Sequence, residues 1–325
     1  ASFDNGVSVS VASDSFLNLD FTGTDVVASL DLGAGPVTGE WGATGSGASN
    51  VSARITGTGT LRVSQNITWD ASDDSDWTGP SDTTSWSTAT FFDGDSVSFG
   101  ATGAGTVTII GAVQTSGVTV DSASDYTFTG DAIGGTGTLT KSGNGRLILA
   151  SANTYTGVTT ISGGQIRISN ADALGTSDGA TILQNGTKLE PVGDLTIAEP
   201  IINQGGGGGK IQSVSGTQTF TGLITLEGSI DIRGNDYIFQ GGITSANNSG
   251  LGINGARYIV DTNPISLGTG TFGLTSAGNN PANTSQLNVA GNVWGLMRLS
   301  FGGYLTLGGD NYMPADAGVE FGWNS

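Results

Sequence analysis

The sequence predicts an all-β protein built as a β-solenoid with little or no helix, and three observations lead to this prediction. Glycine accounts for 56 of the 325 residues, more than twice its usual share of about 7 %. Charged residues make up 12 %, about half of the usual share of roughly 25 %. Apolar residues recur at every second position in short runs, which is the period of a strand with one buried face.

The alternating runs extend along the whole chain and are separated by Gly, Asn and Asp. Each run places two or three apolar side chains on one face of a strand and polar or small side chains on the other. No stretch keeps apolar residues at helical spacing for more than two turns, so we expect at most one helical turn, at residues 170–174. The clearest runs are residues 8–11, 15–21, 60–63, 106–109, 117–120, 126–128, 218–220, 223–226, 229–232 and 304–307.

The spacing of these runs favours a solenoid over a series of hairpins. Hairpins usually join longer strands through two-residue turns, whereas here the strands are short and the turns are dense. In a solenoid, each coil of about 20 residues adds one short strand to each of several parallel sheets. We expect N-terminal solenoid coils over residues 1–65, a Trp- and Asp-rich loop or packing insertion over 66–100, and further coils over 101–325 that continue beyond the end of the chain.

The most regular repeat spans residues 137–168. It reads GTLTKSGNGRLILASANTYTG and, after Val158, TTISGGQIRI, with near-perfect alternation. This segment resembles the passenger-associated repeat of bacterial autotransporters, and weaker echoes of it occur at residues 55–63 and 211–232.

The resemblance implies a right-handed parallel β-helix that is exported and displayed outside a Gram-negative-type cell. The chain begins at Ala1 without Met, which fits both a removed export signal and an excised fragment. Autotransporter passengers are followed by a membrane-embedded barrel, whereas residues 321–325 read as part of a strand of the passenger itself. An outer-membrane barrel is therefore an expected partner only if the natural protein continues past Ser325.

The composition excludes several classes of function. The chain has no His and no Cys, which removes Ser-His-Asp triads, thiol nucleophiles, thiolate zinc sites and disulfides. A net charge of −18 has the wrong sign for binding nucleic acid. The Gly-x-Ser-x-Gly pattern at 175–179 lacks a His base and reads as a turn, and the glycine run at 204–210 departs from the phosphate-loop pattern and reads as a flexible loop.

The segment from Thr68 to Phe99 combines aromatic rings with closely spaced carboxylates. Such a segment either packs against the solenoid core, with Asp serving the turns, or binds Ca²⁺ or sugar rings. The spacing matches neither of the two common calcium-loop patterns. The candidate calcium ligands are Asp70, Asp73, Asp74 and Asp76.

Large side chains near the two ends of the chain are candidates for self-association or ligand binding. Solenoid ends expose unpaired strand edges, so stacking of one molecule on the next would produce filaments. The candidate contact residues are Trp41, Trp69, Trp77, Trp86, Trp294 and Met297.

Three cations within the repeat, Lys141, Arg146 and Arg167, are expected to face outward as a small cationic stripe. Some β-helix polysaccharide lyases pair a basic residue with Asp-bound Ca²⁺, although this comparison rests on fold alone. The other interpretation is that these are solvated charges that discourage lateral pairing of sheets.

Two hypotheses for function follow. The first is a secreted, non-enzymatic structural β-solenoid for cell-surface display, adhesion or assembly into extracellular fibres, with copies of itself or surface glycans as partners and no cofactor other than a candidate Ca²⁺. The alternative is a β-helix that binds or cleaves polysaccharides, which requires Asp70–Asp76 or Asp93–Asp95 to meet an Arg on one lateral face.

Overall fold

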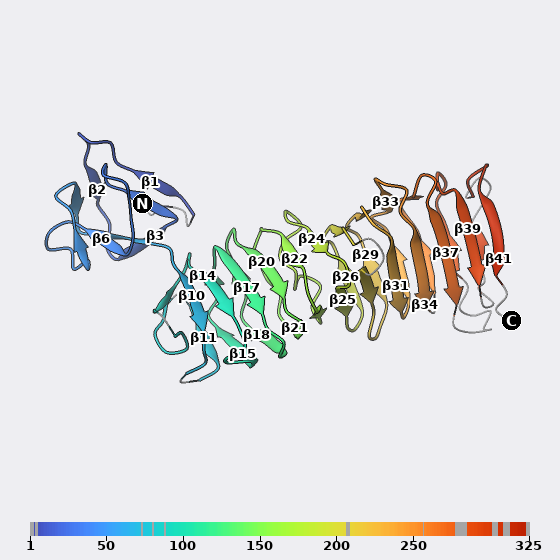
Figure 1. The fold of residues 1–325 in the computed structure, drawn as a ribbon, viewed down its shortest axis with the longest axis horizontal. Coiled ribbons are helices and arrows are strands. Elements are labelled where there is room, and N and C mark those ends of the chain that lie inside the picture. Colours follow the sequence, from blue (N-terminus) through green and yellow to red (C-terminus); the bar gives the residue numbers. More distant parts are fainter. Residues whose placement is uncertain are drawn as a thin grey trace.

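The computed structural model describes residues 3, 6–72, 74–79, 81–87, 89–205, 209–255, 257–276, 285–300, 305–307 and 313–322. All regular secondary structure in these residues is β-strand, which confirms the predicted fold class. The described residues include no helix long and apolar enough to cross a membrane. Most of the strands stack into an elongated parallel β-solenoid of about 13 turns (Figure 1).

Two long parallel sheets run along the solenoid, and their strands alternate along the chain. The 10-stranded sheet consists of β10 (Asn66–Trp69), β14 (Ser96–Phe99), β17 (Gly117–Asp121), β20 (Thr138–Ser142), β22 (Thr159–Ile161), β24 (Thr181–Leu183), β27 (Ile201–Asn203), β30 (Ile224–Leu226), β33 (Ile243–Ser245) and β36 (Ile265–Ser266). The 12-stranded sheet consists of β11 (Asp76–Thr78), β15 (Gly105–Ile110), β18 (Tyr126–Gly130), β21 (Arg146–Leu149), β23 (Gln165–Ile168), β25 (Lys188–Pro191), β28 (Gly209–Gln212), β31 (Ile230–Gly234), β34 (Leu251–Gly255), β37 (Thr271–Ser276), β39 (Leu296–Ser300) and β41 (Gly318–Gly322).

A third parallel sheet begins only at Leu195 and gives the later coils a third side. Its 6 strands are β26 (Leu195–Ile197), β29 (Gln218–Phe220), β32 (Tyr237–Phe239), β35 (Tyr258–Val260), β38 (Ser285–Leu287) and β40 (Leu305–Leu307). The earlier coils carry the short parallel pair β16 (Val113–Gln114) and β19 (Ile133–Gly134), and the antiparallel pair β12 (Ser81–Asp82) and β13 (Phe91–Phe92).

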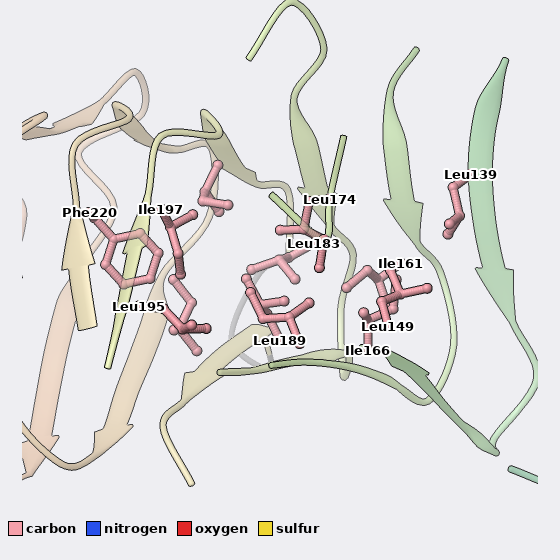
Figure 2. Close-up of a cluster of buried hydrophobic side chains, with 14 of the residues drawn as sticks. Leu139, Leu149, Ile161, Ile166, Leu174, Leu183, Leu189, Leu195, Ile197 and Phe220 are labelled. Atoms are coloured by element: carbon pink, nitrogen blue, oxygen red, sulfur yellow. The ribbon is translucent and has the colours of Figure 1, made fainter. Parts of the chain in front are cut away.

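The core is built by stacking equivalent residues of successive coils. In the 12-stranded sheet, Leu147 pairs with Ile166, which pairs with Leu189, and all three are fully buried. Leu139, Ile161, Leu183 and the inward residues of the facing strands fill the interior between the sheets (Figure 2). Each such side chain contributes about 1.5–3 kcal/mol through removal of apolar surface from water, so the period-two runs of the sequence directly supply the core.

Residues 6–63 form an N-terminal lobe with a hydrophobic cluster of its own (Figure 1). Its nine strands are β1 (Ser8–Ser10), β2 (Leu17–Leu19), β3 (Thr24–Val27), β4 (Ser29–Asp31), β5 (Pro36–Val37), β6 (Glu40–Gly42), β7 (Asn50–Val51), β8 (Ile55–Gly57) and β9 (Thr60–Val63). They pair partly in the parallel manner of coils, as β2 does with β8 and β3 with β9, and partly antiparallel, as β4 does with β5 and β6 with β9.

A buried ion pair joins the N-terminal lobe to the solenoid. Arg62 Nη1 lies 2.6 Å from Asp95 Oδ1, and the two side chains are 7 % and 0 % exposed. The guanidinium group also lies 4.6 Å from the centre of the Phe92 ring. The Asp95 carboxylate accepts further hydrogen bonds from the backbone N–H groups of Gln65 and Phe92. Because both carboxylate oxygens have hydrogen-bonding partners, the free-energy cost of burying the Asp95 charge is compensated. The ion pair therefore connects the lobe to the solenoid.

A column of glycines stands at one corner of the repeat. Gly117, Gly137, Gly157 and Gly179 belong to successive coils, and a Cβ on Gly157 would lie 2.2 Å from the carbonyl oxygen of Gly137. Backbone of one coil therefore lies directly against backbone of the next at this corner, which leaves no space for a side chain.

We expect Gly157→Ala to lower the free energy of unfolding by about 2 kcal/mol, because the added methyl group must push two coils apart. Gly100→Ala is the matched control, since a Cβ at Gly100 has nothing within 4 Å. Urea unfolding of both variants, followed by circular dichroism, tests the expectation. Equal stability of the two variants would show that the corner can relax without cost.

Candidate functional site

The three tryptophans of the Trp- and Asp-rich segment lie inside the molecule. Trp69 and Trp77 are 0 % exposed and Trp86 is 7 % exposed. With Phe91 and Phe99 they form an aromatic cluster, in which Trp86 lies 5.1 Å from Trp69 and 5.4 Å from Trp77 between ring centroids. The prediction that these tryptophans form an exposed association or ligand surface is wrong, because the first coil needs large side chains to close the end of its core.

The two candidate contact residues of the C-terminal half are also buried. Trp294 is 2 % exposed and its ring lies 4.9 Å from that of Phe272, while Met297 on β39 is 1 % exposed. They too are core residues and not an available contact surface. Trp41 differs, since it is half-buried against the core of the N-terminal lobe and donates its Nε1–H to the Thr38 carbonyl at 2.7 Å. A contact role for Trp41 stays a prediction.

Two of the carboxylates predicted to bind Ca²⁺, those of Asp70 and Asp74, accept hydrogen bonds that stabilise turns. Asp70 Oδ1 accepts a hydrogen bond from the backbone N–H of Ser72 at 3.0 Å. Asp74 Oδ1 accepts bonds from the backbone N–H of Asp76 and from Ser85 Oγ, both at 3.0 Å. Asp73 lies outside the described residues. Within the described part of the chain no three acidic side chains gather into a group that could hold a metal ion, and calcium binding stays a prediction.

The Asp93–Asp95 pair does meet an arginine, but in the interior. Asp95 pairs with Arg62 in the joint between lobe and solenoid. Asp93 Oδ1 accepts a hydrogen bond from the backbone N–H of Gln114 at 2.8 Å, and burial, together with nearby Asp95, raises the pKa of its carboxyl group. The pairing therefore serves structure, since Asp95 and Arg62 are closed off from a polysaccharide at a lateral groove.

Of the two short motifs of the sequence, the structure describes the first in full and the second in part. The 175–179 pattern forms a turn in which the Gly179 N–H bonds to the Thr176 carbonyl at 3.3 Å, as predicted. Part of the 204–210 glycine run lies outside the described residues, and β28 begins at Gly209.

Lys141 does not face outward with Arg146 and Arg167, so that part of the predicted stripe is wrong. It lies in the inward column of β20, where it pairs with Val120 on one side and Ile161 on the other, and it is 0 % exposed. Its Nζ donates to the carbonyl oxygens of Ser142 and Gly143, and burial lowers the pKa of its amino group. Lys141 is two positions after Leu139, so the alternation in the sequence already indicates that both side chains point to the same, inward face of the strand.

Arg146 and Arg167 do face outward, and the structure adds further cations to the same face. Six of the chain's 10 cationic residues lie on the outward side of the 12-stranded sheet, between inward residues that form the core. Four of them belong to four consecutive strands, β21, β23, β25 and β28, and we call these four the cationic strip: Arg146, Arg167, Lys188 and Lys210. The other two are Arg233 and Arg298.

One carboxylate lies beneath the cationic strip. Glu190 is 6 % exposed, and its Oε2 lies 2.8 Å from Arg167 Nη2 and 3.3 Å from Arg146 Nε. Its Oε1 lies 3.5 Å from Lys188 Nζ. The side chains of the three cations are 27 %, 28 % and 32 % exposed. Three positive groups thus cover one buried negative group, and the solvent-facing layer of the strip is positive.

At each end of the strip lies a carboxylate that already has hydrogen-bonding or ion-pair partners. Asp125 lies 3.6 Å from Arg146 Nη1 and also accepts the Arg146 N–H at 2.7 Å. Asp231, which pairs in register with Lys210, accepts hydrogen bonds from Arg233 and from the Asn254 amide. The strip therefore has a defined length of three strand steps, which is about 14 Å at the usual spacing of parallel strands.

A parallel β-solenoid that carries this repeat is similar to the passengers of autotransporters. The passenger-associated-transport-repeat family matches residues 139–168, which run from β20 to β23 and include strands of two successive coils. The chain is similar to the adhesin BmaC autotransporter of Brucella suis biovar 1 (strain 1330), with 32 % identity over 131 residues. That alignment covers 38 % of this chain and 4 % of the relative, so the chain spans a small fraction of the relative's length. No solved structure matches the chain.

Proposed function

We propose that this chain is the surface-displayed, adhesive part of an exported autotransporter-type protein and that its role is non-enzymatic. The observation that carries the proposal is the continuous parallel solenoid around a transport-associated repeat. A solenoid of this kind places its side chains on long flat sheets at fixed intervals, which suits multiple weak contacts along an extended ligand. Similarity to a protein named as an adhesin supports the same role.

The test is attachment of beads that carry the purified chain at controlled density. We expect these beads to bind cultured host cells or an abiotic surface severalfold more than beads coated at equal density with an unrelated β-solenoid. The unrelated solenoid is the control for shape and for exposed strand edges. Equal attachment of the two bead types on every surface tried would contradict the adhesive role.

Assembly into fibres is the finer form of the structural hypothesis. Five of the candidate contact residues, Trp69, Trp77, Trp86, Trp294 and Met297, are buried. Any end-to-end contact must therefore use backbone edges or other side chains. Electron microscopy of the purified chain at micromolar concentration distinguishes the two forms. Filaments with an axial repeat of one molecule would support self-assembly. Isolated short rods would contradict it and would be consistent with display and adhesion by single molecules.

A further inference from the structure

We propose that the cationic strip binds a linear polyanionic glycan laid along the axis of the solenoid. The inference rests on the proposed adhesive function and names the class of ligand for it. The strip consists of Arg146, Arg167, Lys188 and Lys210, on β21, β23, β25 and β28.

The first argument is the distribution of charge. The chain has 28 acidic and only 10 basic residues, yet four of the basic residues gather on neighbouring strands of one face. Glu190, the carboxylate that pairs with three of them, is 6 % exposed beneath them, and Asp125 lies at the Arg146 end of the strip. Glu190 fixes the guanidinium and ammonium groups in place without offering negative charge to solvent, which is how a preorganised anion site is held.

The second argument is the spacing. Arg146 pairs with Gln165, Gln165 with Lys188, and Lys188 with Lys210. Successive members of this column are separated by about 4.8 Å, the distance between neighbouring strands. This step is close to the length of one sugar residue in an extended chain, so carboxylate or sulfate groups on successive residues meet successive side chains. Gln165 supplies a neutral hydrogen-bonding position in the middle of the column.

The third argument separates a glycan from a second copy of the protein. A second copy would bring its whole net charge of −18 toward a molecule of the same charge, and this repulsion opposes association. A short glycan chain laid on the strip meets the four cations, with Asp125 and Asp231 at the two ends. Acidic groups farther away are screened beyond a Debye length of about 8 Å at physiological ionic strength.

The experiment measures binding of a heparin hexasaccharide and of a polygalacturonate hexasaccharide by isothermal titration calorimetry at low and at physiological ionic strength. The neutral control ligand is maltohexaose. We expect binding of at least one polyanion, no binding of maltohexaose, and weaker binding as salt rises. The two polyanions distinguish a preference for sulfate from a preference for carboxylate groups.

Three variants place the site on the strip. Lys188→Gln and Lys210→Gln should each weaken binding about three- to fivefold, the effect of one exposed charge contact. Arg257→Gln is the matched control, because Arg257 pairs with Asp236 away from the strip and should leave affinity unchanged. Circular dichroism melting verifies that each variant is folded, and Lys210, which lies at the end of the strip, is the substitution least expected to disturb packing.

Three outcomes would overturn the inference. They are absence of binding to both polyanions, equal affinities of Lys188→Gln, Lys210→Gln and Arg257→Gln, and dimers in analytical ultracentrifugation that Lys210→Gln dissolves without any glycan. Continued bead attachment in the absence of polyanion binding would overturn the inference and leave the adhesive function standing. Strip-dependent glycan binding without bead attachment would contradict adhesion and leave the site standing.

Discussion

Replacing Trp77 with alanine will lower the free energy of unfolding by about 4 kcal/mol, the cost of removing a large aromatic side chain from a closed core. The ring is 0 % exposed and contacts three aromatic neighbours, with centroid distances of 5.3 Å to Phe91, 5.4 Å to Trp86 and 5.7 Å to Phe99. These rings fill the end of the solenoid core next to the N-terminal lobe. Alanine would leave a cavity that the rigid strands on either side cannot collapse to fill.

The measurement is urea unfolding combined with hydrogen exchange. Coils of a solenoid contact mainly their neighbours, so we expect the loss of protection to concentrate in β10, β11, β14 and β15 and to fade toward β34. Uniform loss of protection along the whole chain would show instead that the solenoid unfolds as a single unit. An unchanged free energy of unfolding would show that the aromatic cluster does not support the first coil.

Two phenylalanine variants refine the test. The Trp77 indole N–H is buried without a hydrogen-bond partner in the described residues, whereas Trp69 Nε1 donates to the Gly103 carbonyl at 3.0 Å. Trp77→Phe therefore removes an unsatisfied donor, while Trp69→Phe leaves a carbonyl without its partner. We expect Trp69→Phe to be the more destabilising of the two, by about 1 kcal/mol.

The period-two pattern was sufficient to predict the core of the repeat. Leu139, Leu147, Leu149, Ile161 and Ile166 all alternate with polar residues in the sequence, and all are buried in the structure. Inside a solenoid each coil repeats the same constraint on the next, so a local pattern carries information on the whole fold. The same pattern places Lys141 on the inward face with Leu139. The prediction that it faces outward relied on its charge and not on its position in the alternation.

The cationic strip could not be assembled from the sequence in full. Arg146 and Arg167 lie within the regular repeat, but Lys188 and Lys210 join them only when the lengths of the intervening coils are known, and those lengths vary with the turns. The sequence also did not determine whether the tryptophans are buried, because a Trp- and Asp-rich segment can form either a surface loop or the end of a core. The lobe before β10 contains antiparallel pairs that short alternating runs alone do not distinguish from parallel ones.

Polar residues at inward positions were the other feature beyond sequence reasoning. Thr159 and Thr181 occupy the inward column between Leu139 and Ile201 and are 0 % exposed. Thr159 shares a hydrogen bond of 2.7 Å with the Tyr155 hydroxyl group, and Thr181 Oγ1 donates to Glu199 Oε1 at 3.3 Å. Each threonine interrupts the apolar pattern, and each hydrogen-bonds to a side chain outside its own strand. The alternation of residues along one strand does not reveal such partners.

Glu199 leads to the second large expected effect, a loss of stability as the pH rises. The residue is 4 % exposed, and its Oε2 has no hydrogen-bond partner in the described part of the chain. Burial raises the pKa of its carboxyl group from 4.5 to about 7, and the hydrogen bond from Thr181 only partly opposes this. The neighbouring Tyr155 hydroxyl group stays protonated over the same range, because burial raises its pKa as well.

The direction of the effect follows from the two states of the chain. The unfolded chain releases the Glu199 proton near pH 4.5, whereas the folded chain holds it until about pH 7. Stability from this group is therefore fully present below pH 4.5, falls as the pH rises toward 7, and levels off above it. The raised pKa corresponds to a total loss of about 3 kcal/mol.

The measurement is the free energy of unfolding in urea from pH 4 to pH 9 for the wild type and for Glu199→Gln. Subtracting the two curves removes the contributions of the other acidic groups, including Asp93, whose pKa burial also raises. We expect the difference to change by about 3 kcal/mol between pH 4 and pH 8 in favour of the glutamine variant at high pH. Glu227→Gln, at an exposed position, should run parallel to the wild type. If the Glu199→Gln curve also runs parallel, the carboxyl group is hydrated in solution and the interior beside β27 is open to water.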